Sequence, residues 1–428
     1  MADPETFLPY GRQTIEDDDI AAVTEALRGD YLTTGPLVDR FETAFADKTG
    51  ARFAVVCSSG TAAQHLTALA LDLPAGSQAI VPAVTFLSTA NCARFVGAEV
   101  VFADVSPDTG LMEPDHLREA LERTSPGQAK LAVPVHLGGQ CCDMAGIAAV
   151  AADPRPFDAV LEAFFGGERC VAADRGLGIV EDACHAIGAT YAAPEGKPEG
   201  KKIRAGACAH SDMAVFSLHP VKTITMGEGG VITTNNEGLA SRLKLFRNHG
   251  MVRDPELFRN GPQAFDSRGA PNPWYYEMSD LGFNYRSPDI NCALGLSQLA
   301  KLDRFVAARR ALADRYDGVL AGLAPVVKPV SRMPGGDPAW HLYVVLIDFA
   351  AAGTDRAELM AKLRARGIGT QVHYIPVPWQ PYYRERYGDI PLPGAAAYYR
   401  KCLSLPLYPG MTEADVDRVA GALGELLA

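Results

Sequence analysis

Short apolar runs alternate with amphipathic stretches through the first three hundred residues of the chain. Helical periodicity predicts helices over 13–29, 36–49 and 60–71. Runs of mostly apolar residues predict strands at 53–57, 79–82, 99–102, 131–134 and 178–181. Buried strands separated by helices are typical of a mainly parallel sheet covered on both faces. We therefore predict an α/β fold.

The pattern changes towards the end of the chain. A long helical stretch at 299–320 precedes an apolar strand at 340–347, a helix at 355–366, an extended run at 369–374 and a terminal helix at 411–427. This predicts a large domain over 1–300 and a smaller α+β domain over 301–428. Three segments interrupt the alternation: an aromatic and charged stretch at 152–171, an exposed loop or loose hairpin at 191–206, and an irregular stretch at 252–275.

Composition narrows the class of protein. The 428 residues are 48% hydrophobic, which is enough for a large core, and the formal charge of −11 disfavours nucleic acid as a partner. Nine cysteines, without a Cys-x-x-Cys pair, indicate a reducing compartment and no metal clip. The polar N-terminus is unlike a secretory signal, and no apolar run approaches the length of a membrane span. We expect a cytoplasmic protein that does not enter a membrane.

The stretch Phe-Ser-Leu-His-Pro-Val-Lys-Thr-Ile-Thr-Met-Gly-Glu-Gly-Gly at 216–230 carries the most informative chemistry. A lysine amine forms a Schiff base with an aldehyde, as pyridoxal phosphate (PLP) chemistry requires, and Lys222 stands between a strand-like run and a glycine-rich turn. Glycines allow a close approach of backbone to a ligand. A phosphate-binding P-loop is excluded, because that motif places its glycines before the lysine. A surface lysine in a hairpin is the alternative.

The strand at 178–182 ends in an acidic residue, Asp182. Ligands bind outside the carboxyl ends of strands in open α/β sheets, so Asp182 is expected in a cleft. A carboxylate there suits the pyridine nitrogen of PLP, which must stay protonated for the ring to act as an electron sink. A helix N-cap is the alternative role for Asp182. His185 is either structural or a partner that holds Asp182 in place.

Three further positions follow predicted strands or precede helices. The sequence Ser-Ser-Gly-Thr-Ala-Ala at 58–63 combines hydroxyls with backbone amides at a helix start, which suits a phosphate, or makes an ordinary helix cap. Phe86 follows the strand at 79–82 and is placed to stack on a pyridine ring, or lies in the core. Asn284 and Arg286 precede a predicted helix. Without the other motifs, Arg286 would be interpreted as a charged side chain exposed to solvent.

Taken together and in this order, these motifs resemble the DegT/DnrJ/EryC1/StrS family of PLP-dependent sugar aminotransferases. The resemblance covers the chain from about residue 13 to its end. It rests on Ser-Gly-Thr-Ala at 59–62, Thr-Phe at 85–86, Glu-Asp-Ala-Cys-His at 181–185, Phe-Ser-Leu-His-Pro-Val-Lys at 216–222, Glu-Gly-Gly at 228–230, Arg-Asn-His-Gly at 247–250 and Gly-Phe-Asn-Tyr-Arg at 282–286.

The resemblance implies a fold-type-I PLP transferase with a mainly parallel seven-stranded sheet, active as a homodimer with shared active sites. It implies that Lys222 binds the cofactor aldehyde and acts as general acid and base, and that Asp182 pairs with the pyridine nitrogen. Its further implied roles are ring stacking by Phe86, phosphate binding by Gly60, Thr61 and Ser217, and a phosphate contact from the partner subunit by Asn284.

Within the family, the stretches at 32–36, 248–251 and 274–298 look most similar to aminotransferases of the pseudaminic acid pathway. This implies a UDP-linked 4-keto-6-deoxy-N-acetyl sugar as substrate and L-glutamate as amino donor. We expect Thr34, Arg253, Tyr285 and His373 to contact the substrate. A dTDP- or GDP-linked sugar, as in perosamine-type enzymes, is the alternative.

A sugar dehydratase and a non-catalytic binding protein are the other classes. Related dehydratases carry histidine in place of the lysine, and a binding protein should lose Asp182 or Lys222, so both residues argue against these classes. The chain departs from the family pattern in two places. The stretches between Asp143 and Asp182 and between Asp182 and Lys222 are longer than usual, and Leu218 stands where the family often has Phe.

Overall fold

The computed structural model describes residues 7–152, 164–165, 168–169, 177–193 and 202–427. Seven strands form one sheet in the order β1-β11-β10-β7-β4-β2-β3, and only β11 runs antiparallel to its neighbours. Their bounds are β1 (Phe53–Cys57), β2 (Gln78–Pro82), β3 (Glu99–Ala103), β4 (Ala129–Ala132), β7 (Gly178–Asp182), β10 (Met213–Ser217) and β11 (Gly230–Thr234). The mainly parallel α/β sheet predicted from the sequence is confirmed.

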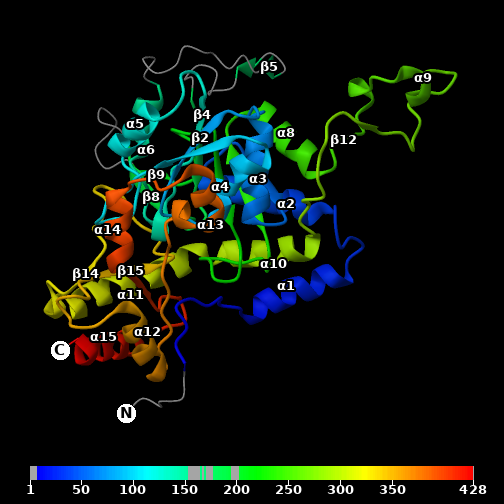
Figure 1. Cartoon of the computed structure of the whole chain (residues 1–428). Helices are drawn as coiled ribbons and strands as arrows, with labels where there is room; N and C mark the ends of the chain where they lie inside the picture. Colours follow the sequence, from blue (N-terminus) through cyan, green and yellow to red (C-terminus); the bar gives the residue numbers. More distant parts are fainter. Residues whose placement is uncertain (1–6, 153–163, 166–167, 170–176, 194–201, 428) are drawn as a thin grey trace.

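Helices surround this sheet (Figure 1). Every residue of β7 and β11 is buried, so both faces of the sheet are covered. The helices are α1 (Asp17–Arg28), α2 (Pro36–Thr49), α3 (Gly60–Ala70), α4 (Leu87–Phe95), α5 (Pro114–Glu122), α6 (Met144–Ala151), α8 (Glu237–Arg247), α9 (Gly261–Ala264), α10 (Asp289–Ala300), α11 (Leu302–Leu320), α12 (Arg356–Ala365), α13 (Pro381–Tyr387), α14 (Pro393–Lys401) and α15 (Glu413–Leu427).

The last third of the chain forms a separate antiparallel sheet. Its strands are β14 (Val327–Pro329), β15 (Tyr343–Ile347) and β16 (Cys402–Leu405), in that spatial order. The predicted run at 369–374 contributes only one bridge, between Gln371 and Ser404. The domain boundary at residues 300 and 301 stays a prediction.

Two predicted helices differ from those in the structure. Helix α1 begins at Asp17 rather than 13, because Glu16 and Asp19 form a capping box that defines the first turn. The stretch at 299–320 is divided between α10 and α11 at Lys301, whose ammonium group lies 2.6 Å from Asp18. Burial of the same apolar stripe continues across this break, so the periodicity alone does not reveal it.

The interrupting segments differ in structure. The described ends of the stretch at 191–206 form a hairpin of β8 (Thr190–Ala192) and β9 (Lys202–Arg204). Most of 152–171 lies outside the described residues, apart from the short pair β5 (Phe164–Phe165) and β6 (Glu168–Arg169). The stretch from β12 (Met251–Val252) through α9 to β13 (Glu277–Met278) projects away from the body of the molecule (Figure 1).

Within the described residues, no helix is both long enough and apolar enough to cross a membrane.

Candidate active site

The carboxyl ends of the parallel strands bring the predicted site residues to one edge of the main sheet. Strand β10 pairs with β7 so that Val215 lies opposite Asp182, and Ser217 follows two residues later. Strands β1 and β10 both meet Gly230 at this edge, through Cys57 and Ser217 respectively. The loop that carries Lys222 therefore leaves the sheet beside the end of β7.

Lys222 is half-buried in this loop. Removal from water lowers the pKa of its amine below the usual range, although the charges of Cys184 and Asp182 act in the opposite direction. The charge of Lys222 in turn helps to lower the pKa values of His185 and His341, after burial as the main cause. Lys222, Asp182 and these histidines thus lie within electrostatic reach of one another.

Asp182 is buried at the end of β7, and both of its carboxylate oxygens have partners. Thr89 donates its hydroxyl to Oδ2 at 2.6 Å, and the Cys184 amide donates to Oδ1 at 3.2 Å. Turns rather than a helix follow at 183–189, so Asp182 is not the helix cap that was the alternative. Thr89 lies on α4 and contacts Thr85 at 2.8 Å. Sequence reasoning missed it, because nothing local relates it to β7.

The candidate anion cradle predicted from the sequence lies where α3 begins. Ser59 caps the helix by accepting the Ala62 amide, which leaves the first amides of α3 without partners inside the helix. A Cβ added at Gly60 would lie 2.9 Å from Ser217 Cβ, and one added at Gly230 would lie 2.2 Å from the Ser59 carbonyl oxygen. Gly60 and Ser217 are thus adjacent, as expected for a shared phosphate site. Thr61 is exposed beside them.

Phe86 and His185 both approach Tyr374. Phe86 is 55% exposed, which excludes the core as its location, and its ring centroid is 6.1 Å from that of Tyr374. Nδ1 of His185 accepts the Gly138 amide at 3.2 Å, so Nε2 carries the proton and faces the Tyr374 hydroxyl at 3.2 Å. The two ring nitrogens of His185 thus bond to Gly138 and Tyr374 rather than to Asp182.

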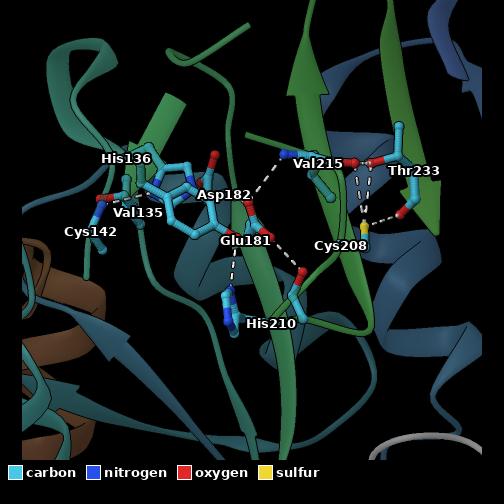
Figure 2. A network of polar contacts seen from close by, with 12 residues as sticks. Val135, His136, Cys142, Glu181, Asp182, Cys208, His210, Val215 and Thr233 are labelled. Atoms are coloured by element: carbon cyan, nitrogen blue, oxygen red, sulfur yellow. Dashed lines mark hydrogen bonds and ion pairs between the residues drawn. The ribbon is translucent and has the colours of Figure 1, made fainter. Parts of the chain in front are cut away.

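A buried polar network supports the end of β7 from inside the protein (Figure 2). Glu181 accepts hydrogen bonds from His136 Nε2 at 3.1 Å, the Gly206 amide at 3.2 Å and the Ser211 hydroxyl at 2.5 Å. The His136 amide also donates to the carbonyl of Asp182 at 3.0 Å. The sequence placed Glu181 in a strand and in the motif at 181–185 but did not indicate its hydrogen-bond partners, because they are distant along the chain.

The residues predicted to contact the substrate have different surroundings. Thr34 and Arg253 are exposed. The hydroxyl of Tyr285 lies within hydrogen-bond distance of His65 Nδ1, at 3.2 Å. His373 is buried and bonds the Ser404 hydroxyl at 2.7 Å through Nδ1. Burial and the charge of Lys222 lower the pKa of His373 to about 3. These contacts favour a structural role for His373.

Asn284 is exposed beside this site. Its backbone bridges to Asn248, and the neighbouring carbonyl of Tyr285 accepts the Ser58 amide at 2.8 Å. Asn284 thus belongs to the same edge of the sheet as the anion cradle, with its side chain on the surface. Among the described residues, no group of three or more His, Cys, Asp or Glu side chains is arranged to hold a metal ion.

Comparison with known proteins agrees with this geometry. The model of the DegT/DnrJ/EryC1/StrS aminotransferase family matches residues 13–155 and 168–424. The chain belongs to this family. It is a PLP-dependent sugar aminotransferase of the α/β class, as the resemblance of its motifs implied.

Solved structures of similar proteins align along nearly the whole chain. Helicobacter pylori PseC, an aminotransferase of pseudaminic acid biosynthesis, is 25% identical with a TM-score of 0.80, and the alignment covers 99% of each chain. S. venezuelae DesV, solved with a ketimine intermediate, is 28% identical with a TM-score of 0.77 over 97% of this chain and 99% of that one. A Streptococcus pneumoniae relative, 26% identical with a TM-score of 0.82, covers 98% of this chain and 99% of its own and was solved in its PMP form.

The residues at the edge of the sheet fit the cofactor of this family. The amides of α3 and the Ser217 hydroxyl suit a phosphate, Asp182 supplies a buried carboxylate, and Lys222 supplies an amine whose pKa is lowered.

Proposed function

We propose that this family member transfers the amino group of L-glutamate to the 4-keto group of a nucleotide-linked 6-deoxy-N-acetyl sugar, with UDP as the nucleotide. We further propose a role in making pseudaminic acid or a related surface glycan. The similarity to H. pylori PseC along the whole chain supports this substrate class. A dTDP-linked sugar is the second candidate, because the DesI structure, 27% identical to this chain, was determined with a TDP-sugar product.

The observation that carries the proposal is the sheet register that sets Asp182 opposite Val215, so that Ser217 and the Lys222 loop follow beside it, with Gly60 adjacent to Ser217. PLP, when bound, supplies an aldehyde and an electron-withdrawing ring. Lys222 would hold that aldehyde, and its lowered pKa makes the neutral amine available to move a proton at the substrate carbon. Asp182, oriented by Thr89, would keep the ring nitrogen protonated. Phe86 would cover one face of the ring.

We also propose that two copies of the chain form a homodimer with shared active sites. The projecting stretch from β12 to β13 and the residues that follow expose large apolar side chains, which is typical of surface that a partner covers. Trp274 is 74% exposed and Leu281 is 76% exposed. Asn284 follows on the same stretch, so a second copy seated here would meet it. Sedimentation equilibrium tests the assembly, and a monomer at micromolar concentration would refute it.

Borohydride reduction of the PLP-loaded protein, followed by peptide mapping, tests the assignment of Lys222. A single label on Lys222 is expected, and a label on another lysine would refute the assignment. Wild type and Lys222→Ala are then assayed with glutamate and a panel of UDP-, dTDP- and GDP-linked 4-keto sugars. Turnover of the UDP-linked N-acetyl sugar by wild type alone supports the proposal. Turnover of another nucleotide sugar in its place would refute the finer substrate assignment.

A further inference from the structure

The first turn of α10 contacts two loops that the proposed reaction requires. Helix α10 begins at Asp289, directly after the motif at 282–286, and its residues 289–298 have no part in the proposed chemistry. Two polar side chains of this turn, Asp289 and Asn291, contact segments more than sixty residues away in the sequence. One segment carries Lys222, and the other carries Thr34.

Asn291 holds the glycine turn that follows Lys222. Its side-chain amide donates to the carbonyl of Met226 at 2.9 Å and to the carbonyl of Glu228 at 3.0 Å. These carbonyls flank Gly227, whose φ of +80° lies in the left-handed region that favours glycine. Both donor positions of one amide are thus used on one turn, which is an arrangement that an aspartate of the same shape cannot reproduce.

The Lys222 loop has few other polar ties to the rest of the protein. Most of its hydrogen bonds are internal, such as those from the Met226 amide to Leu218 at 3.0 Å and from the Lys222 amide to His219 at 2.9 Å. An additional contact to α10 runs from the Thr225 amide to Gln298 at 3.4 Å. The two short bonds from Asn291 therefore make a large contribution to the placement of this loop relative to α10.

Asp289 holds the other loop in the same way. This fully buried carboxylate accepts the Gly35 amide at 2.8 Å and the Leu37 amide at 3.0 Å, which caps the start of α2. The Asp289 amide donates to the Leu32 carbonyl at 3.0 Å. The turn between these anchors contains Thr34 at a φ of +55°, a conformation that is uncommon for a residue other than glycine. The hydrogen bonds of Asp289 on both sides of this turn hold it in place.

We propose that Asn291 and Asp289 are positioning residues that fix the Lys222 loop and the Thr34 turn relative to one another. The inference rests on the proposed function, in which Lys222 binds the cofactor, and on the prediction from the sequence that Thr34 contacts the sugar. Because the two side chains lie two residues apart on one helical turn, the distance between the two loops is set by a rigid element. A shift of about 1 Å in such a group costs on the order of 100-fold in rate.

The test uses isosteric variants of the full-length protein that change the Asn291 contact with the Lys222 loop and the Asp289 contact with the Thr34 turn separately. Asn291→Asp replaces two donors by acceptors that face carbonyl oxygens, so we expect a PLP dissociation constant raised about 10-fold or more, weaker borohydride trapping at Lys222 and a lower kcat. Asp289→Asn puts one amide group against a backbone amide, so we expect KM for the sugar to rise about 5-fold or more, with PLP binding unchanged.

Ile290→Val is the matched control, because this half-buried residue lies between the two on the same turn. Asn291→Ala, which removes the donors without adding charge, keeps the test open if the aspartate variant does not fold. The inference is overturned if the PLP dissociation constant and kcat of both Asn291 variants lie within about two-fold of those of Ile290→Val. A two-fold change is smaller than the usual contribution of one hydrogen bond. It is also overturned if the Asp289 and Asn291 variants change PLP affinity and sugar KM in the same way. A borohydride label on another lysine in wild type would instead refute the proposed function.

Discussion

Glu181 tests how the active site is supported from inside the sheet. Its carboxylate is fully buried and accepts three hydrogen bonds, from His136, Gly206 and Ser211. Glu181→Gln keeps the shape and removes the charge. Its carbonyl oxygen can retain the His136 and Gly206 donors, and Ser211 can turn its hydroxyl to accept from the new amide. Glu181→Ala leaves all three donors without a partner.

The magnitudes follow from these contacts. Burial raises the pKa of Glu181, but the hydrogen bonds from His136, Ser211 and Gly206 outweigh it and hold the pKa below its usual range. Hydrogen bonds to a charged group contribute about 1.5–3 kcal/mol, and neutral ones about 0.5–1.5 kcal/mol. We therefore expect Glu181→Gln to lower the free energy of unfolding by about 1–3 kcal/mol. Glu181→Ala should lower it by about 3–5 kcal/mol, as for breaking a buried pair.

Denaturant unfolding across a pH series measures this contribution. Because the pKa of Glu181 is lower in the folded state, its stabilisation is complete above the unfolded value of about 4.3 and is lost as the pH falls through the folded pKa. The difference between wild type and Glu181→Gln should therefore be largest at neutral pH and shrink in acid. Glu385→Gln, at an exposed position of α13, is the control. A glutamine variant as stable as wild type at pH 7 would refute the reasoning.

Three further outcomes are expected. Thr89→Val removes the donor to Asp182, so PLP should dissociate about 10-fold more readily in absorbance titrations, and an unchanged dissociation constant would contradict this role. Gly60→Ala puts a methyl group 2.9 Å from Ser217 Cβ, so inorganic phosphate and PLP should both bind about 10-fold more weakly by calorimetry. Lys222→Met should raise the thermal midpoint of the apoprotein at pH 7. Because burial lowers the pKa of Lys222, folding destabilises its charged amine at pH values below the unfolded pKa of about 10.4. The gain in thermal midpoint should therefore vanish above that pH, and a gain that persists there would contradict the lowered pKa of Lys222.

The sequence by itself determined the type of sheet and the edge at which the site lies. The strand at 178–182 is apolar until its last two residues, and this local pattern indicates both a buried strand and an acid at its carboxyl end. Gly60, Ser217 and Lys222 follow or precede strands in the same way. Because parallel strands share one carboxyl edge, their ends meet wherever the fold is of this class.

Only the tertiary structure decided which side chains support these groups. Thr89 lies 93 residues before Asp182, and Asn291 lies 65 residues after Met226, so their pairing depends on how helices α4 and α10 rotate and pack against the sheet. The partner of His185 was likewise decided by a loop of the last third of the chain, which carries Tyr374. A hydrogen bond requires placement to within a few tenths of an ångström, whereas hydrophobic periodicity specifies only which face of an element is buried.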